Sequence, residues 1–275
     1  MKKENLGTLL ACVAIIAEIM LLSGCREKTG ETSPRDYAEI AASGVLRVVT
    51  DYSPLTYYMT HDSITGFDYE LLQMIGKRTN LKIEITPEVS LTKSLEGLDD
   101  RSYDVIARLL PVTTENKQKY IFTKPLQLNK QVLVQRRDST GNVAIRNQLD
   151  LGQCTLHIAQ DAPTRLRIEN LSHEIGDTIY IKEEPDCGAE QLIILVASGV
   201  IDYAVCDEAE ARAIGDTYDA IDCQTDISFT QFMAWTLRQE STALCDSLNR
   251  WIDEISRTKE YKSLKEKYFG NPKKR

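Results

Sequence analysis

The feature that most constrains the fold is an alternation of β-branched runs with stretches of helical periodicity. The runs VLRVVT from Val45 and KIEIT at 82–86 predict buried strands, and a helix with one apolar face lies between them. A second series begins with TLHIA at 155–159 and continues with TIYIK at 178–182. Strands that alternate with helices indicate βαβ units and a mostly parallel sheet. We therefore predict an α/β protein with two α/β lobes.

The lobe boundaries follow from two extended crossings. A chain of 275 residues exceeds what one hydrophobic core usually serves. The strand QVLVQR at 131–136, with the flexible RRDSTGN after it, is expected to lead into the second lobe, and the strand at 229–237 to return from it. The C-terminal helices then fold back on the first lobe. The predicted domains are lobe 1 over 44–133 plus 230–275 and lobe 2 over 134–229.

The N-terminus has the pattern of an exported lipoprotein. Two lysines precede the apolar run at 9–22, which ends in LSGC and resembles a bacterial lipobox. The alternative, an uncleaved membrane anchor, is disfavoured because a span needs roughly 20 apolar residues and this run contains Glu18. We expect a signal peptide over 1–24, cleavage before Cys25, acyl chains such as palmitate on that cysteine, and a tether over 25–43.

The residue after the lipidated cysteine bears on the membrane that holds the anchor. Arg26 stands there, so the acidic inner-membrane retention signal of enteric bacteria is absent, which favours the outer membrane. We expect a location in the cell envelope, with the protein held by its lipid and facing the periplasm.

Composition excludes several kinds of partner and cofactor. The net charge is -8, from 33 basic and 41 acidic side chains, so no basic field attracts nucleic acid. The histidines and cysteines show no zinc-binding spacing, and no metal or other cofactor is expected. The four cysteines from 154 to 223 allow up to two disulfides in an exported protein. Buried thiols are the alternative, which we favour for Cys154 and Cys206.

Several short motifs, taken in order, resemble the type 2 periplasmic solute-binding proteins of the polar amino-acid family. They are LRVVTD at 46–51, GFD at 66–68, DVIA at 104–107, DYAVCD at 202–207 and the YFG that ends a terminal helix at 261–270. The resemblance covers residues 44–270. It implies the periplasmic-binding-protein-like type 2 fold, in which two lobes on a two-strand hinge close over a small amino-acid-like or peptide-like ligand.

Within this family two stretches are most similar to the binding module of membrane-bound lytic murein transglycosylase F. They are SPLTYY and GFDYELLQMIGKRTNLKIEI. In that enzyme a muramidase-like catalytic domain follows the module. The resemblance therefore implies the module without the lyase.

The resemblance also assigns ligand contacts to individual residues. The aromatic shelf after the first strand falls on Tyr52, beside Asp51, and the ammonium acceptor falls on Asp207. A carboxylate at that place forms a charge-assisted bond to a cationic group, although it can also cap the helix that follows. The second aromatic shelf, expected around 89–91, is missing.

The side of the site that would hold a ligand carboxylate departs from the family pattern. Family members place small residues on the loop and an Arg at the helix start, because guanidinium binds carboxylate bidentately. Here those positions are Leu109, Pro111 and Asn116. The turn of the second lobe reads QDAPT, in which Asp161 repels an anion and Thr164 is the remaining contact. Arg108 is either a displaced positive charge or part of a surface salt bridge.

Together these features predict a non-catalytic, monomeric binding protein for transport or sensing. Its expected partner is an ABC permease or a cell-wall enzyme. One alternative is a regulatory or scaffold lipoprotein whose cleft is degenerate. Another is a periplasmic enzyme on the same fold, such as a cyclohexadienyl dehydratase, which needs an acid beside a carboxylate clamp. Because Asn116 replaces the expected Arg, we predict weak binding of free amino acids.

Overall fold

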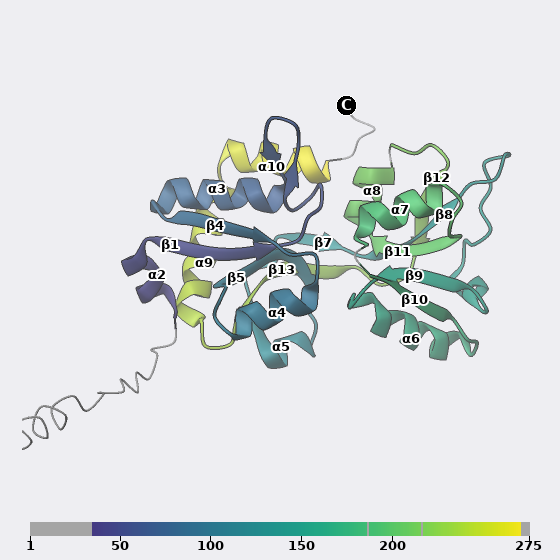
Figure 1. The fold of residues 1–275 in the computed structure, drawn as a ribbon, viewed down its shortest axis with the longest axis horizontal. Coiled ribbons are helices and arrows are strands. Elements are labelled where there is room, and N and C mark those ends of the chain that lie inside the picture. Colours follow the sequence, from purple (N-terminus) through teal and green to yellow (C-terminus); the bar gives the residue numbers. More distant parts are fainter. Residues whose placement is uncertain (1–34, 186, 216, 271–275) are drawn as a thin grey trace, which may run out of the picture. The chain divides into compact units, whose positions relative to one another are not determined.

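Two mixed sheets with helices packed on their faces make up the described part of the chain (Figure 1). The computed structural model describes residues 35–185, 187–215 and 217–270. The predicted α/β class is confirmed. The predicted signal peptide, the lipidation site at Cys25 and most of the tether lie outside the described residues.

The first sheet joins parallel strands to antiparallel ones. Its order is β4-β1-β5-β13-β6, and β7 also pairs with β13. The parallel strands are β1 (Val45–Thr50), β4 (Lys82–Pro87) and β5 (Val105–Pro111). The antiparallel strands are β6 (Tyr120–Phe122), β7 (Gln127–Asn129) and β13 (Gln231–Arg238).

The second sheet repeats this plan in the order β10-β9-β11-β8-β12. Its parallel strands are β9 (Thr155–Ala159), β10 (Tyr180–Glu184) and β11 (Tyr203–Asp207). Its antiparallel strands are β8 (Gln131–Arg136) and β12 (Ile221–Asp226). Among the described residues one strand in each sheet, β13 or β8, runs against all the others, and every antiparallel pair involves it. The sheets are therefore mostly parallel in strand direction, although directly parallel pairs join only three strands in each.

The chain changes sheets earlier than the composition suggested. Asn129 still pairs with Gln231 in the first sheet, whereas Gln131 already pairs with Asp207 in the second. The first crossing is therefore at Lys130, before β8, whereas the strand at 131–136 and the RRDSTGN after it were expected to form the entry into the second lobe. Movement of the two halves about these crossings stays a prediction.

Helices cover both faces of each sheet through separate apolar clusters. On the first sheet one face carries α2 (Tyr37–Ser43), α3 (Phe67–Thr79), α9 (Thr242–Ser256) and α10 (Lys259–Phe269), and the other carries α4 (Leu91–Asp99). On the second sheet α7 (Ala189–Ala197) and α8 (Glu208–Gly215) lie opposite α6 (Thr164–Ile175) and the 3-10 turn η1 (Gln148–Leu151). Pro163 is the N-cap of α6.

Gly66 is the N-cap of α3 and connects this helix to the loop after β1. Its φ is 132°, and a Cβ at this position would lie 2.2 Å from the carbonyl oxygen of Thr56. The backbone N–H of Phe67 donates to the carbonyl of Leu55, and that of Tyr69 to the carbonyl of Thr56. Only glycine fits such a close approach with this backbone conformation. The GFD motif therefore fixes the loop over 51–57 against the start of α3.

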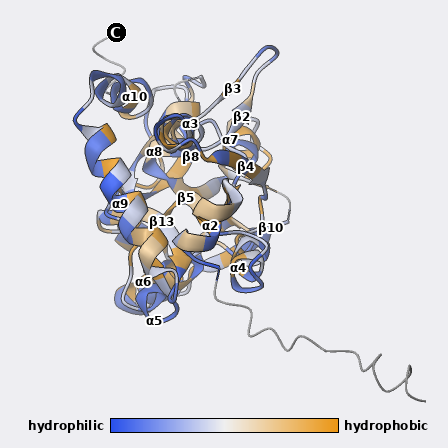
Figure 2. Cartoon of the chain, turned by 90° about the vertical axis from the view of Figure 1, so that its left-hand side faces the viewer, coloured by the Kyte–Doolittle hydropathy of each residue, from blue (hydrophilic) through white to orange (hydrophobic). Residues whose placement is uncertain are grey.

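A short hairpin follows that loop. Its strands are β2 (Tyr58–Met59) and β3 (Ile64–Thr65), which pair antiparallel. Figure 2 shows the hairpin projecting beyond the neighbouring helices, and its tip at 59–63 is exposed. No helix within the described ranges is long and apolar enough to cross a membrane.

The two thiols that we expected to be buried in strands differ from each other. Cys206 is buried within β11, where burial raises the pKa of its thiol well above the usual range. Cys154 is only partly buried and directly precedes β9. Both carry free thiols, and the strand position holds for Cys206 alone.

Candidate functional site

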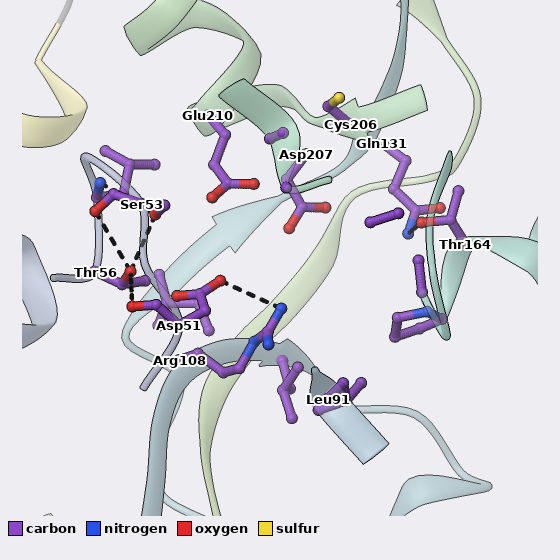
Figure 3. A pocket seen from close by; sticks show the side chains of 18 of the residues that line it. Asp51, Ser53, Thr56, Leu91, Arg108, Gln131, Thr164, Cys206, Asp207 and Glu210 are labelled. Carbon is purple, nitrogen blue, oxygen red and sulfur yellow. Dashed lines mark hydrogen bonds and ion pairs between the residues drawn. The ribbon is translucent and has the colours of Figure 1, made fainter. Parts of the chain in front are cut away.

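A cavity lies at the carboxyl ends of the parallel strands and is lined by residues of both sheets (Figure 3). Its volume is about 1110 Å³, including the space that is open to solvent. The lining comes from the loop after β1, the end of β5, the turn after β9 and the junction of β11 with α8. Ligands of open α/β sheets bind outside the carboxyl ends of the strands. The topology therefore makes this cavity the candidate site.

Most of the predicted contact residues lie in this cavity. Those that line it are Asp51, Tyr52, Arg108, Leu109, Pro111, Thr164 and Asp207. Asn116 and Asp161 instead line an adjoining hollow that shares Leu91, Pro111 and Gln131 with the cavity. Asp161 is exposed and has a φ of 58°, a left-handed conformation that Asp adopts more readily than most residues.

Sequence reasoning missed several polar residues of the cavity. Among them are Ser53, Gln131 and Glu210. Glu210 had a usable signal, because it follows Asp207 by three residues where α8 begins, and residues at this spacing share one side of a helical turn. Ser53 and Gln131 had none, since each reaches the cavity only through the folding of a loop or a crossing.

Arg108 and Asp51 form an ion pair inside the cavity. Nη2 of Arg108 lies 3.2 Å from Oδ2 of Asp51, and the two side chains are 19% and 16% exposed. Nη1 of Arg108 also donates to the carbonyl of Val89. Of the two expectations for Arg108, the salt bridge is the one observed. Both of its residues line the cavity, however, and not the outer surface. Oδ1 of Asp51 is buried and has no hydrogen-bond partner among the described residues.

Two further carboxylates face this pair from the second sheet. Figure 3 shows the side chains of Asp207 and Glu210 pointing toward Asp51 and Arg108. The carboxylate of Asp207 forms no hydrogen bond or ion pair with any described residue. Burial raises the pKa of Asp207 to about 6, an effect that the charge of Arg108 opposes and that of Asp51 reinforces.

Glu210 is shifted further in the same direction. Burial and the charges of Asp51 and Asp207 raise the pKa of Glu210 to about 8, against a hydrogen bond from Ser53 and the charge of Arg108. Desolvation and like charges both disfavour an ionised carboxylate. A strongly perturbed group in a cleft is typical of a functional site.

The positions expected to hold a ligand carboxylate offer few free donors. Pro111 has no backbone N–H to donate. Nδ2 of Asn116 donates to the carbonyl of Pro111 at 3.1 Å, which ties this amide to its own loop. In the second half, Nε2 of Gln131 donates to Oγ1 of Thr164 at 2.9 Å. The remaining cation, Arg108, is already paired with Asp51.

The rest of the lining is mainly apolar. Tyr52 is 42% exposed, and its ring centroid lies 5.4 Å from that of Tyr58. Val89 and Leu91 line the place of the missing second aromatic shelf. Within the described ranges no group of three or more His, Cys, Asp or Glu side chains can hold a metal ion. The arrangement can bind a cationic group at its acidic side and an apolar body beside it.

Curated proteins of similar sequence cover most of this chain. Membrane-bound lytic murein transglycosylase F from Cronobacter sakazakii is 27% identical over 273 residues, which is 98% of this chain and 52% of that protein. The same-named protein from Aliivibrio fischeri is 26% identical over 263 residues, 95% of this chain and 52% of that protein. The chain thus spans about half the length of these curated relatives.

Solved structures and a family model complete the comparison. A mutant of ArgBP from T. maritima superimposes with a TM-score of 0.72 at 22% identity, over 85% of this chain and 99% of that one. Its likeness confirms the type 2 periplasmic-binding fold. The model for bacterial extracellular solute-binding proteins, family 3, matches residues 46–271, nearly all of the part predicted to be folded. The chain therefore belongs to the bacterial extracellular solute-binding proteins of family 3.

Proposed function

We propose that the protein is a lipid-anchored, non-catalytic solute-binding protein that closes over a small amino-acid-like or peptide-like ligand. The observation that carries this proposal is the cavity, which is lined from both sheets and has charged groups converging on an apolar wall. Family membership supports a ligand-binding role outside the cytoplasm. The ligand is passed to an ABC permease or sensed by a cell-wall enzyme, and the anchor faces the periplasm.

A thermal-shift screen against pooled metabolites tests the binding role. A ligand that binds only the folded protein stabilises it by mass action, by about 2.7 kcal/mol when the ligand concentration is a hundred times Kd. The melting temperature rises accordingly. For a confirmed ligand, small-angle scattering then tests closure, and we expect a smaller radius of gyration when it is bound. A screen without a single shift would contradict the proposal and favour a degenerate cleft with a scaffold role.

The lipid anchor is tested separately. Metabolic labelling with a fatty-acid analogue should mark the full chain and leave the Cys25→Ala variant unlabelled. Label that persists on the variant would contradict the anchor and leave the binding role standing.

An enzyme on this fold is the second candidate, and one observation favours it. Glu210, whose pKa is raised to about 8, holds a proton at neutral pH beside the cavity, as a general acid does. An ancestral amino-acid-binding protein, a precursor of cyclohexadienyl dehydratase, has a similar fold. It superimposes with a TM-score of 0.71 at 22% identity, over 84% of this chain and 98% of that one. A dehydratase also needs a clamp for its substrate's carboxylate, and the candidate positions here are Pro111 and Asn116. Product formation from prephenate or arogenate would favour the enzyme over the binder.

A further inference from the structure

The charges of the cavity are unbalanced in a way that restricts its ligand. Three carboxylates, Asp51, Asp207 and Glu210, face one guanidinium, Arg108. When all are ionised the site carries an excess of two negative charges. A desolvated site with such an excess favours a ligand that supplies positive charge.

The acceptors on this side are also incompletely used. Oδ1 of Asp51 is buried without a hydrogen-bond partner among the described residues. Asp207 and Glu210 point toward the same space (Figure 3), and Ser53 is the only described group that donates to either carboxylate. An ammonium group has three N–H donors and no acceptor, which matches this set of acceptors. The unused oxygens therefore indicate an amine as the occupant.

A carboxylate on the ligand has no comparable place. Pro111 lacks the N–H, the amide of Asn116 is bound to the carbonyl of Pro111, and Arg108 is paired with Asp51. A ligand carboxylate near these groups would meet the three acidic side chains without a free cation. Its burial would cost free energy instead of contributing it.

The same acidic side does not fit a metal ion. No group of three or more His, Cys, Asp or Glu side chains in the described ranges converges closely enough to coordinate one. The wall beside the acidic groups is apolar and includes Leu91, Leu192 and Val205. An organic cation with an alkyl body fits both parts of the cavity, since the alkyl chain covers the wall.

From these contacts we propose that the cavity selects an organic amine that carries two positive charges and no free carboxylate, of the linear diamine class. Asp207 and Glu210, together with the free oxygen of Asp51, receive the ammonium groups. The inference rests on the proposed binding function and specifies the ligand of the same site. It reverses the preference for free α-amino acids that an arginine at position 116 would give.

Matched pairs of ligands test this choice by isothermal calorimetry. Cadaverine is lysine without its carboxylate, and agmatine is arginine without its carboxylate. We expect each amine to bind at least about 10-fold more tightly than its amino acid, because the carboxylate of the amino acid would be buried without partners. Pentylamine, which has one charge, should bind more weakly than cadaverine.

Variants assign the preference to the cavity. Asp207→Asn and Glu210→Gln should each weaken cadaverine binding by about 10-fold. Glu208→Gln is the matched control, because Glu208 lies on the same helix but contacts Arg212 and Lys130 outside the cavity. Circular dichroism and the melting temperature confirm that each variant folds. The unmodified protein's ligand ranking gives a test that does not depend on the variants.

The outcomes separate this inference from the proposed function. Tighter binding of lysine or arginine than of the amines overturns the inference and leaves the binding function intact. Equal affinity for pentylamine and cadaverine overturns the requirement for two charges. If none of these probes binds while a pooled metabolite shifts the melting temperature, the inference alone fails. If nothing binds at all, both fail.

Discussion

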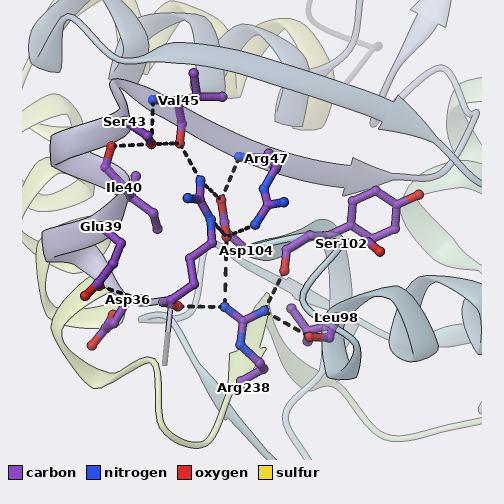
Figure 4. A network of polar contacts seen from close by, with 12 residues as sticks. Asp36, Glu39, Ile40, Ser43, Val45, Arg47, Leu98, Ser102, Asp104 and Arg238 are labelled. Carbon is purple, nitrogen blue, oxygen red and sulfur yellow. Dashed lines mark hydrogen bonds and ion pairs between the residues drawn. The ribbon is translucent and has the colours of Figure 1, made fainter. Parts of the chain in front are cut away.

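Two clusters of charge in this protein are built in opposite ways. Directly before β5, one carboxylate, Asp104, lies between the guanidinium groups of Arg35, Arg47 and Arg238 (Figure 4). In the cavity one guanidinium, Arg108, faces three carboxylates (Figure 3). The first cluster has an excess of cations and the second an excess of anions.

The hydrogen bonds of the two clusters explain the difference. Both oxygens of Asp104 accept, from Nε of Arg35 at 2.7 Å and from the backbone N–H of Arg47 at 2.9 Å. Arg238, which is nearly fully buried, also donates to the carbonyls of Leu98 and Arg35. The protein itself thus satisfies the carboxylate of this cluster, although the Nε atoms of Arg47 and Arg238 are buried without a hydrogen-bond partner among the described residues. The cavity leaves acceptors unused, which indicates that a ligand completes it.

The same Asp→Asn substitution in the two clusters should change stability by very different amounts. Asp104→Asn should lower the free energy of unfolding by about 3 kcal/mol, because it leaves buried guanidinium groups without their counter-charge. Asp207→Asn should not lower it at pH 8, since the ionised carboxylate it removes is itself destabilised by burial. Urea denaturation measures both variants. Equal losses would show that the cavity carboxylate is compensated within the protein after all.

A cation added beside Pro111 should give the cavity a place for a ligand carboxylate. We expect Asn116→Arg to tighten lysine binding by about 10-fold, the worth of a charged hydrogen bond of about 1.4 kcal/mol. Cadaverine should not gain, because it has no carboxylate. Calorimetry of the two ligands on this variant and on Asn116→Gln, which adds length without charge, is the measurement. An equal gain for both ligands would point to a change in packing instead.

Glu210 should make the stability of the folded protein depend slightly on pH. The pKa of Glu210 is raised in the folded state, so the folded protein binds this proton more tightly than the unfolded chain does. Its contribution to stability is therefore lost as pH rises from the ordinary Glu range toward about 8. Glu210→Gln should raise the melting temperature at pH 8 by about 2 to 4 °C, for about 1 kcal/mol after allowance for solvent in the cavity.

That gain should vanish near pH 5, where Glu210 is protonated in the unmodified folded protein. Asp68, whose pKa is raised well above its usual range by burial, has the same sign, so some slope with pH should remain in the variant. A constant gain at both pH values would contradict the assigned pKa shift.

The fold was predictable because its pattern is local. The runs VLRVVT and GFD predict β1 and the start of α3 from neighbouring residues alone, without any knowledge of contacts to the rest of the chain. The first crossing was placed too late, because the composition of RRDSTGN marks a loop but does not tell which side of β8 changes sheets. Strand pairing at Gln131, which decides this, is a contact between residues far apart in the sequence.

The candidate site was predictable only in part. Asp51, Tyr52 and Asp207 sit directly at strand ends, where topology brings them together. The pairing of Arg108 with Asp51, and the bond from Asn116 to Pro111, depend on side-chain directions that no spacing shows. Glu210 was missed, although its spacing of three residues from Asp207 could have been recognised in the sequence.

If the unpaired carboxylates of the cavity bind a cationic ligand, a proton should leave the protein when that ligand binds. Cadaverine is titrated into the protein by calorimetry at pH 7 in phosphate and in Tris, whose ionisation enthalpies differ. Because Glu210, with a pKa of about 8, is mostly protonated at that pH, binding of a dication should release about one proton per ligand, and affinity should rise with pH. With Glu210→Gln the release should fall to near zero. Binding without proton release from the unmodified protein, or no binding of cadaverine at all, would contradict the account.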